Sequence, residues 1–85
     1  RPIQRVPAVY PRAAEAQGTE GVVRARVLVG ADGVVQRVVI LSSKPKGVFD
    51  TAARDALRLW RFSPAKLAGR PLRVWVRQRL FFGLK

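Results

Sequence analysis

Apolar and polar residues alternate along three segments of the chain. In residues 22–29, valine and alanine hold the odd positions, and two arginines stand at even positions. The same alternation returns in residues 34–41 and in residues 72–82, where arginines again separate apolar residues. A period of two is typical of a strand with one buried face. We therefore expect three strands, one in each segment.

Two other segments carry helical signals. Apolar residues recur at spacings of four, three and four from Phe49 to Trp60, the stripe of an amphipathic helix that ends before Pro64. Pro11 suits the first turn of a shorter, alanine-rich helix, and Gly18 supplies its stop signal. The predicted elements therefore follow the order α-β-β-α-β.

The connections between these elements determine the expected topology. Residues 30–33 read Gly-Ala-Asp-Gly, which are turn residues, and join the first two strands into an antiparallel hairpin. Residues 42–47 and the segment around Pro71 are predicted loops, and residues 1–9 an extended lead-in. A right-handed crossover then places the first strand between the other two. The expected fold is α+β: a three-stranded antiparallel sheet of order 2-1-3, with two helices on one face and the last strand at an open edge.

The composition narrows the range of functions. The chain has 85 residues, enough for one domain, and contains no cysteine and no histidine. It therefore lacks an imidazole base, a thiol nucleophile and the ligand set of a zinc finger, and its five carboxylates are scattered. We expect a binding module and not an enzyme, with no catalytic residue, no metal site and no cofactor.

The charge of the chain points to an anionic partner. Seventeen Lys and Arg residues against five Asp and Glu residues give a net charge of +12. Residues 56–85 hold eight of the basic residues and no acidic residue. Such a segment favours nucleic acid, lipopolysaccharide or an acidic protein surface as the partner. A solvated, arginine-rich face without any partner explains the charge equally well.

Six short motifs occur in order along the chain. They are Tyr10-Pro11, Gly21-Val22-Val23, Asp32-Gly33, residues 42–45, Phe49-Asp50 and residues 56–64, which read ALRLWRFSP. Gly69 and a terminal strand follow them. Together these motifs cover roughly residues 7–82 and resemble the C-terminal domain of TonB, the periplasmic energy transducer of Gram-negative bacteria.

The resemblance implies a function and a set of partners. A TonB protein has an N-terminal membrane helix that works with ExbB and ExbD, a Pro-rich periplasmic linker, and a C-terminal domain that captures the TonB box of an outer-membrane transporter. By this likeness, residues 1–9 are the end of the periplasmic linker and residues 10–85 the TonB-like C-terminal domain. The domain would lie in the periplasm, in a protein anchored in the inner membrane. It would transmit proton-motive energy for uptake of iron chelates, haem, cobalamin or similar nutrients.

The resemblance also implies where the partner binds. In the family the TonB box, together with contacts to the transporter plug, is received as an added strand along the terminal β-strand, which here is the open edge at residues 73–80. The segment before the first helix also contacts transporter boxes. The implied partner-binding residues are Val6, Pro7, Tyr10, Arg73, Val74, Trp75, Val76, Arg77, Gln78, Arg79 and Leu80.

Local roles are open for several of these residues. Arg73, Arg77 and Arg79 suit gatekeepers that prevent unspecific edge pairing. Tyr10 suits a staple that holds the start of the first helix against the core. Trp60, at helical core spacing, we assign to packing alone.

Trp75 leaves further partners open, because it shares a predicted face with six arginines. The arginines of its own chain could cover it through cation–π contact. A homodimer is a second account, since some TonB-like domains pair through their terminal strands. Nucleic acid is a third, but the chain lacks the first strand and the aromatic pattern of an RNA-recognition motif. A TolA-like envelope interaction domain is a further alternative, against which residues 60–64 argue.

Overall fold

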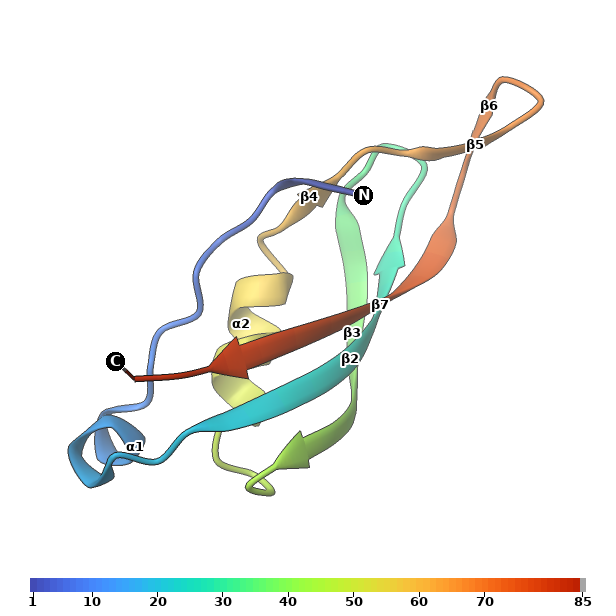
Figure 1. Ribbon diagram of the computed structural model, residues 1–85. Helices are drawn as coiled ribbons and strands as arrows, with labels where there is room; N and C mark the ends of the chain where they lie inside the picture. Colours follow the sequence, from blue (N-terminus) through green and yellow to red (C-terminus); the bar gives the residue numbers. More distant parts are fainter. Residues whose placement is uncertain (85) are drawn as a thin grey trace.

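The central sheet is built from the three alternating segments. In the computed structural model, which describes residues 1–84, β2 (Gly21–Val29) lies between β3 (Val35–Lys44) and β7 (Val74–Phe82). Both neighbours run antiparallel to β2 (Figure 1). The predicted α+β class and the strand order 2-1-3 are confirmed.

The helices cover one face of this sheet. α2 (Asp50–Leu57) lies across it, and the shorter α1 (Arg12–Gln17) packs at one end (Figure 1). The main core joins Ala25, Val27 and Val29 of β2 to Leu57 and Trp60, all less than 5% exposed. Alternation therefore gives β2 one face in the core and one face in solvent.

A second core cluster ties α1 to the sheet. Ala14 packs with Val23, Ala53 and two aromatic residues, Phe49 and Phe82. The two phenylalanine rings stack with their centroids 4.4 Å apart. Because Phe82 is the last residue of β7, this stack fixes the end of the outer strand against the start of α2.

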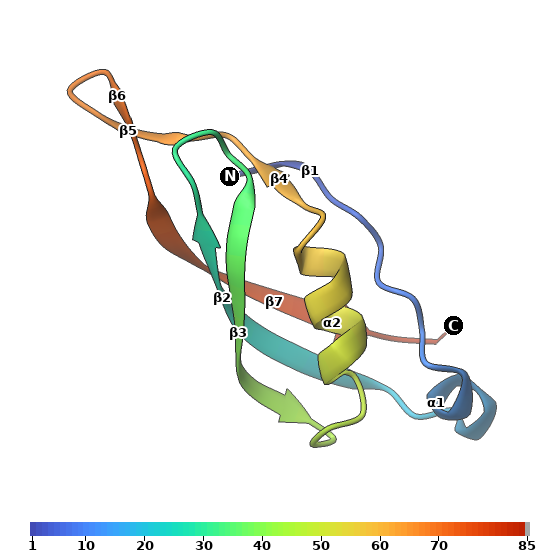
Figure 2. The same cartoon turned by 180° about the vertical axis from the view of Figure 1, so that it is seen from behind.

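Two small two-stranded ladders were not predicted. β1 (Pro2–Gln4) pairs with β4 (Arg61–Phe62), and β5 (Ala65–Leu67) pairs with β6 (Arg70–Leu72). The second ladder is a hairpin that projects beyond the end of the sheet (Figures 1 and 2). The described chain measures 49 × 20 × 17 Å along its principal axes, and so is elongated.

Three predicted boundaries were wrong. Ser42, Ser43 and Lys44 continue β3 where a loop was expected, because they pair with residues 22–24 of β2. The last strand does not run unbroken over residues 72–82, since Arg73 separates β6 from β7. α2 ends at Leu57, before Trp60, because the backbone tightens there into turns whose N–H groups donate three residues back.

Candidate functional site

β7 is the outermost strand of the three-stranded sheet and, among the described residues, pairs only with β2. In an antiparallel ladder, alternate residues direct both their N–H and C=O groups toward one neighbouring strand. The other residues of β7 direct theirs away from β2. The free side of β7 is therefore a row of backbone donors and acceptors from Val74 to Phe82.

A groove lies between this edge and the lead-in. Residues 5–10 pass beside the C-terminal half of β7, as the blue segment of Figure 1 shows. The groove has a volume of about 520 Å³. It is lined by Arg5, Val6, Pro7, Ala8, Tyr10, Trp60, Gln78, Arg79, Leu80, Phe81, Phe82 and Gly83. We call it the edge groove.

Trp60 holds the lead-in in place beside the groove. Its indole Nε1 donates a hydrogen bond of 3.0 Å to the carbonyl oxygen of Val6, and its side chain is only 4% exposed. The guanidinium of Arg5 lies over the ring at 5.5 Å from its centroid. Trp60 was predicted to serve packing alone, and the structure corrects this: it is a core residue that also lines the groove. A buried indole N–H requires an acceptor, which was the one signal for this contact.

Tyr10 fixes the carboxyl end of the lead-in to the core. Its phenol donates a hydrogen bond to the carbonyl oxygen of Thr19, and its ring meets Phe49 and Phe82 edge-on, at 5.5 and 5.9 Å. Partial burial raises the pKa of Tyr10, and the negative charges of Glu20 and Glu15 raise it further. The predicted staple role of Tyr10 fits this packing, and the same side chain lines the edge groove.

The structure brings together six of the residues singled out in the sequence. Val6, Pro7 and Tyr10 form one wall of the edge groove, and three residues of β7 form the other. Those three are Gln78, Arg79 and Leu80. The lining residues that were not singled out as partner-binding are Arg5, Ala8, Trp60, Phe81, Phe82 and Gly83.

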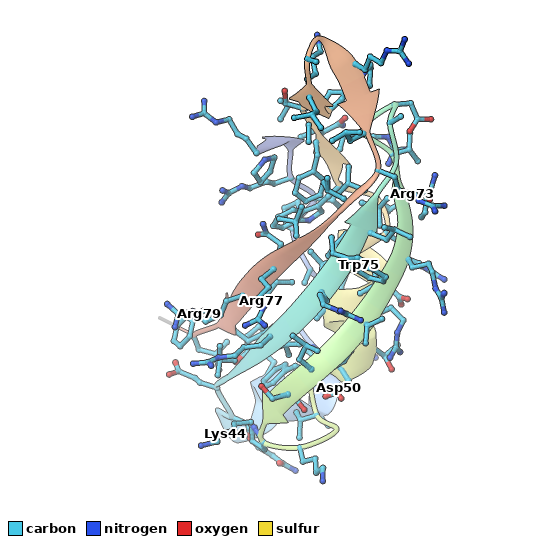
Figure 3. All side chains as sticks on the ribbon, turned by 90° about the vertical axis from the view of Figure 1, so that its right-hand side faces the viewer. Lys44, Asp50, Arg73, Trp75, Arg77 and Arg79 are labelled. Carbon is cyan, nitrogen blue, oxygen red and sulfur yellow. The ribbon has the colours of Figure 1, made fainter. Side chains whose placement is uncertain are left out.

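The remaining predicted residues lie elsewhere on or near β7. Val74 and Val76 line a separate hollow of about 380 Å³, beside Arg1 and residues 62–65. Trp75 and Arg77 are exposed on the sheet face opposite α2, which is turned toward the viewer in Figure 3. Arg73 is exposed between β6 and β7 and belongs to neither strand.

Trp75 is covered by an arginine of its own chain. The guanidinium of Arg26 lies 4.3 Å from the centre of the Trp75 ring, and the ring is 41% exposed. This is the intramolecular contact that the sequence had left as one of three accounts.

The described residues give no sign of a metal site or a membrane-spanning helix. Within residues 1–84, no three histidine, cysteine, aspartate or glutamate residues gather as metal ligands would. Neither described helix has the length and apolar character required to cross a bilayer. The residues that line the edge groove offer hydrogen bonding, apolar contact and positive charge.

The chain is similar to known proteins over most of its length. Residues 6–84 match the family described as Gram-negative bacterial TonB protein C-terminal. The chain is 33% identical over 85 residues to protein TonB of Pseudomonas aeruginosa PAO1. This match covers 100% of this chain and 25% of that protein. It is 39% identical over 66 residues to protein TonB of Escherichia coli K12, and this match covers 78% of this chain and 28% of that protein. The chain thus spans about a quarter of the length of these curated relatives.

A solved structure has the same fold. The solution NMR structure of the Pseudomonas aeruginosa TonB CTD superimposes with a TM-score of 0.83 at 33% sequence identity. The match covers 100% of this chain and 86% of that chain.

Proposed function

Because this chain belongs to the family of TonB C-terminal domains, we propose that it serves TonB-dependent transport by capturing the TonB box of an outer-membrane transporter. The box would add to the free side of β7 as a fourth strand of the sheet. The observation that carries the proposal is the edge groove, which sets an unpaired strand edge beside a lead-in held by Trp60.

The groove supplies the two kinds of contact that strand addition requires. Outward N–H and C=O groups of β7 offer main-chain hydrogen bonds, and about five of them, at ~1 kcal/mol net each, supply roughly 5 kcal/mol. Ordering a flexible box offsets much of this gain. Val6, Pro7 and Leu80 offer apolar contact to side chains of the added strand. Moderate, reversible binding follows, which suits a domain that must engage and release.

Charge at the groove favours an acidic box or plug surface. Arg5 and Arg79 line the groove, and both side chains are exposed. Exposed charges steer an oppositely charged partner and accelerate association more than they strengthen the final complex. Arg73, Val74, Trp75, Val76 and Arg77 extend the docking segment along and beside the same strand.

The rest of the transport cycle is part of the same proposal. Residues 1–9 would be the end of a periplasmic linker, and residues 10–85 the box-binding domain. ExbB and ExbD would supply proton-motive energy through an inner-membrane segment, and the transporter would carry an iron chelate, haem, cobalamin or a similar nutrient. The domain itself performs no catalysis in this scheme. A second copy on the β7 edge would compete with the box.

Amide chemical shifts test the docking site. A synthetic peptide that carries a TonB box should shift the backbone amides of Val74–Phe82 and of residues 6–10 in an NMR titration. Shifts confined to α2 or to the free edge of β3 would contradict the proposal. Sedimentation analysis at the same concentrations separates box binding from dimer formation.

Two N-methylated peptides test strand addition itself. In an added strand only every second N–H faces the edge of β7. Methylation of one alternate set should therefore abolish binding, and methylation of the other set should leave it intact. Equal effects of the two peptides would rule out addition to a single edge.

A matched pair of variants tests the charge contribution. Arg24 and Arg79 lie directly opposite each other in neighbouring strands, but only Arg79 lines the groove. Arg79→Gln should weaken binding of an acidic box by about three- to fivefold at low salt, and Arg24→Gln should leave it unchanged. Equal losses would mean that net charge alone attracts the peptide.

A further inference from the structure

The sheet face opposite α2 carries five arginines from three neighbouring strands. Since Val27 on β2 is buried, its neighbours along the strand point to the opposite face. The pairing registers place residues of β3 and β7 beside them on that face. We define the arginine face as Arg24, Arg26, Arg37, Arg77, Arg79 and Trp75, three of which are labelled in Figure 3.

Like charges oppose each other directly on the arginine face. Arg24 is paired with Arg79, and Arg26 with Arg77. Directly opposed like charges destabilise a sheet. None of the five acidic residues lies on these strands: Glu15 is in α1, Glu20 precedes β2, Asp32 is in the turn after β2, and Asp50 and Asp55 are in α2. The domain therefore carries an uncompensated cationic surface at a cost in stability.

Three of these arginines converge on one hollow. Arg24, Arg77 and Arg79 line a space of about 200 Å³ together with Leu41, which is 47% exposed. Guanidinium groups pair with phosphate oxygens through two parallel hydrogen bonds. An apolar side chain beside a cluster of phosphate-binding groups suits a phosphate that is attached to an apolar chain.

We propose that the arginine face binds the surface of an anionic phospholipid membrane, with a lipid phosphate in the hollow at Arg24, Arg77 and Arg79. The exposed side chains on this face fit the headgroup layer, because Trp75 is amphipathic and Leu41 and Phe81 (74% exposed) are apolar. Positive charge spreads over three strands, which suits a planar array of headgroups.

A single-stranded nucleic acid fits the same surface less well. Such a partner follows a cationic groove and stacks its bases on successive aromatic rings. The two aromatic residues of the face, Trp75 and Phe81, lie near opposite ends of β7, and Arg26 occupies one side of the Trp75 ring at 4.3 Å. The membrane surface requires no such stacking.

Vesicle binding tests the proposal. The protein should bind vesicles that contain about 30 mol % phosphatidylglycerol and should not bind pure phosphatidylcholine vesicles. The double variant Arg24→Gln, Arg77→Gln should bind about thirtyfold more weakly. The control Arg54→Gln, Arg58→Gln removes two arginines from the helix side and should lose less than about threefold. Equal losses in the two variants, or equal binding to both vesicles, would overturn the proposal.

Quenching of tryptophan fluorescence identifies the face that binds. The chain has two tryptophans, and Trp60 is buried at 4% exposure, so acrylamide reports on Trp75. Anionic vesicles should protect Trp75 from the quencher, and bound protein without protection would place the contact elsewhere.

Two competitors separate the sources of phosphate. Inorganic phosphate is added in place of vesicles at the same phosphate concentration. If it protects Trp75 from the quencher as well as vesicles do, the arginine face binds isolated anions and not a membrane surface. Single-stranded DNA is the second competitor. If it binds more tightly than the vesicles, and if the Arg24→Gln, Arg77→Gln variant loses affinity for it by the same factor, nucleic acid is the partner. Either result would overturn the membrane assignment.

Discussion

Tyr10 joins the lead-in to the core through a neutral phenol. The phenol donates to the carbonyl oxygen of Thr19, and its ring packs edge-on against Phe49 and Phe82. Partial burial and the nearby Glu20 and Glu15 raise its pKa above 10, so the neutral form is preferred in the folded chain. The hydrogen bond that holds Tyr10 beside the edge groove therefore requires the protonated phenol.

This raised pKa predicts a loss of stability in alkali. The unfolded chain releases the Tyr10 proton near pH 10, before the folded chain does, so the contribution of Tyr10 is complete below that pH. It declines as the pH rises through the higher folded pKa. Tyr10 is the sole tyrosine, so the absorbance of its phenolate should show a midpoint above pH 10. Tyr10→Phe should flatten the decline of the unfolding free energy, and an unchanged pH profile would contradict the assignment.

At the scale of elements, the projecting hairpin has a residue unsuited to its turn. β5 and β6 are joined by Ala68 and Gly69, with φ angles of 51° and 80°. A two-residue hairpin loop with two positive φ angles favours Asn followed by Gly. Ala68 therefore holds a left-handed conformation that costs an ordinary residue about 1 kcal/mol.

Ala68→Asn should stabilise this hairpin locally. We expect the amides of residues 65–72 to exchange with solvent about two- to fivefold more slowly, since Asn tolerates the left-handed region. Ala68→Val, whose branched side chain tolerates that region poorly, should accelerate exchange. Faster exchange in Ala68→Asn would mean that the turn differs from the one described. Neither change should alter the edge groove, because Ala68 does not line it.

At the scale of the whole molecule, charge repulsion opposes folding. The net charge is +12, and within residues 1–84 the structure forms one ion pair, from Arg58 to Asp55, with both side chains more than 60% exposed. Exposed pairs contribute little to stability. Compaction therefore gathers positive charges that are mostly unpaired.

Salt should consequently stabilise the domain. Raising the ionic strength from about 10 mM to about 150 mM shortens the screening length from roughly 30 to 8 Å. We expect ~1 kcal/mol more stability, or a Tm about 4–8 °C higher, by calorimetry. Arg24→Gln should raise the Tm at low salt, since it relieves the repulsion from Arg79, whereas Arg58→Gln should not. A Tm that falls with salt would show that attractive pairs dominate.

The sequence predicted the long, periodic elements and missed the short ones. β2, β7 and α2 carry enough alternation or helical spacing to be recognised. β1 and β4 have three and two residues, too few for a period, and Ala68 is not a typical turn residue. In β3, register shifts between residues 35 and 37 and between residues 40 and 42 displace the strict alternation, so Val35 packs toward the core like Val38.

The site was predictable only in part, because one of its walls is placed by a contact between residues far apart in the sequence. Alternation and topology locate the open edge of β7, but no local pattern places the lead-in beside it. That contact depends on the hydrogen bond from Trp60 to Val6, which joins residues 54 positions apart. The expectation for Val6, Pro7 and Tyr10 came from the family likeness.

The pairing of β1 with β4 has a mechanical consequence for a chain under tension. A strand added along the nine-residue β7 and pulled along its length would load its hydrogen bonds together, in shear. β1 is held by a ladder of two residue pairs and by the bond from the Ser63 N–H to the Arg1 carbonyl. Tension applied at Arg1 would meet only these few bonds, whereas a strand added along β7 would be held by many more. β1 would therefore detach from β4 before the added strand left β7, and the amino end would lengthen while the joint at β7 held.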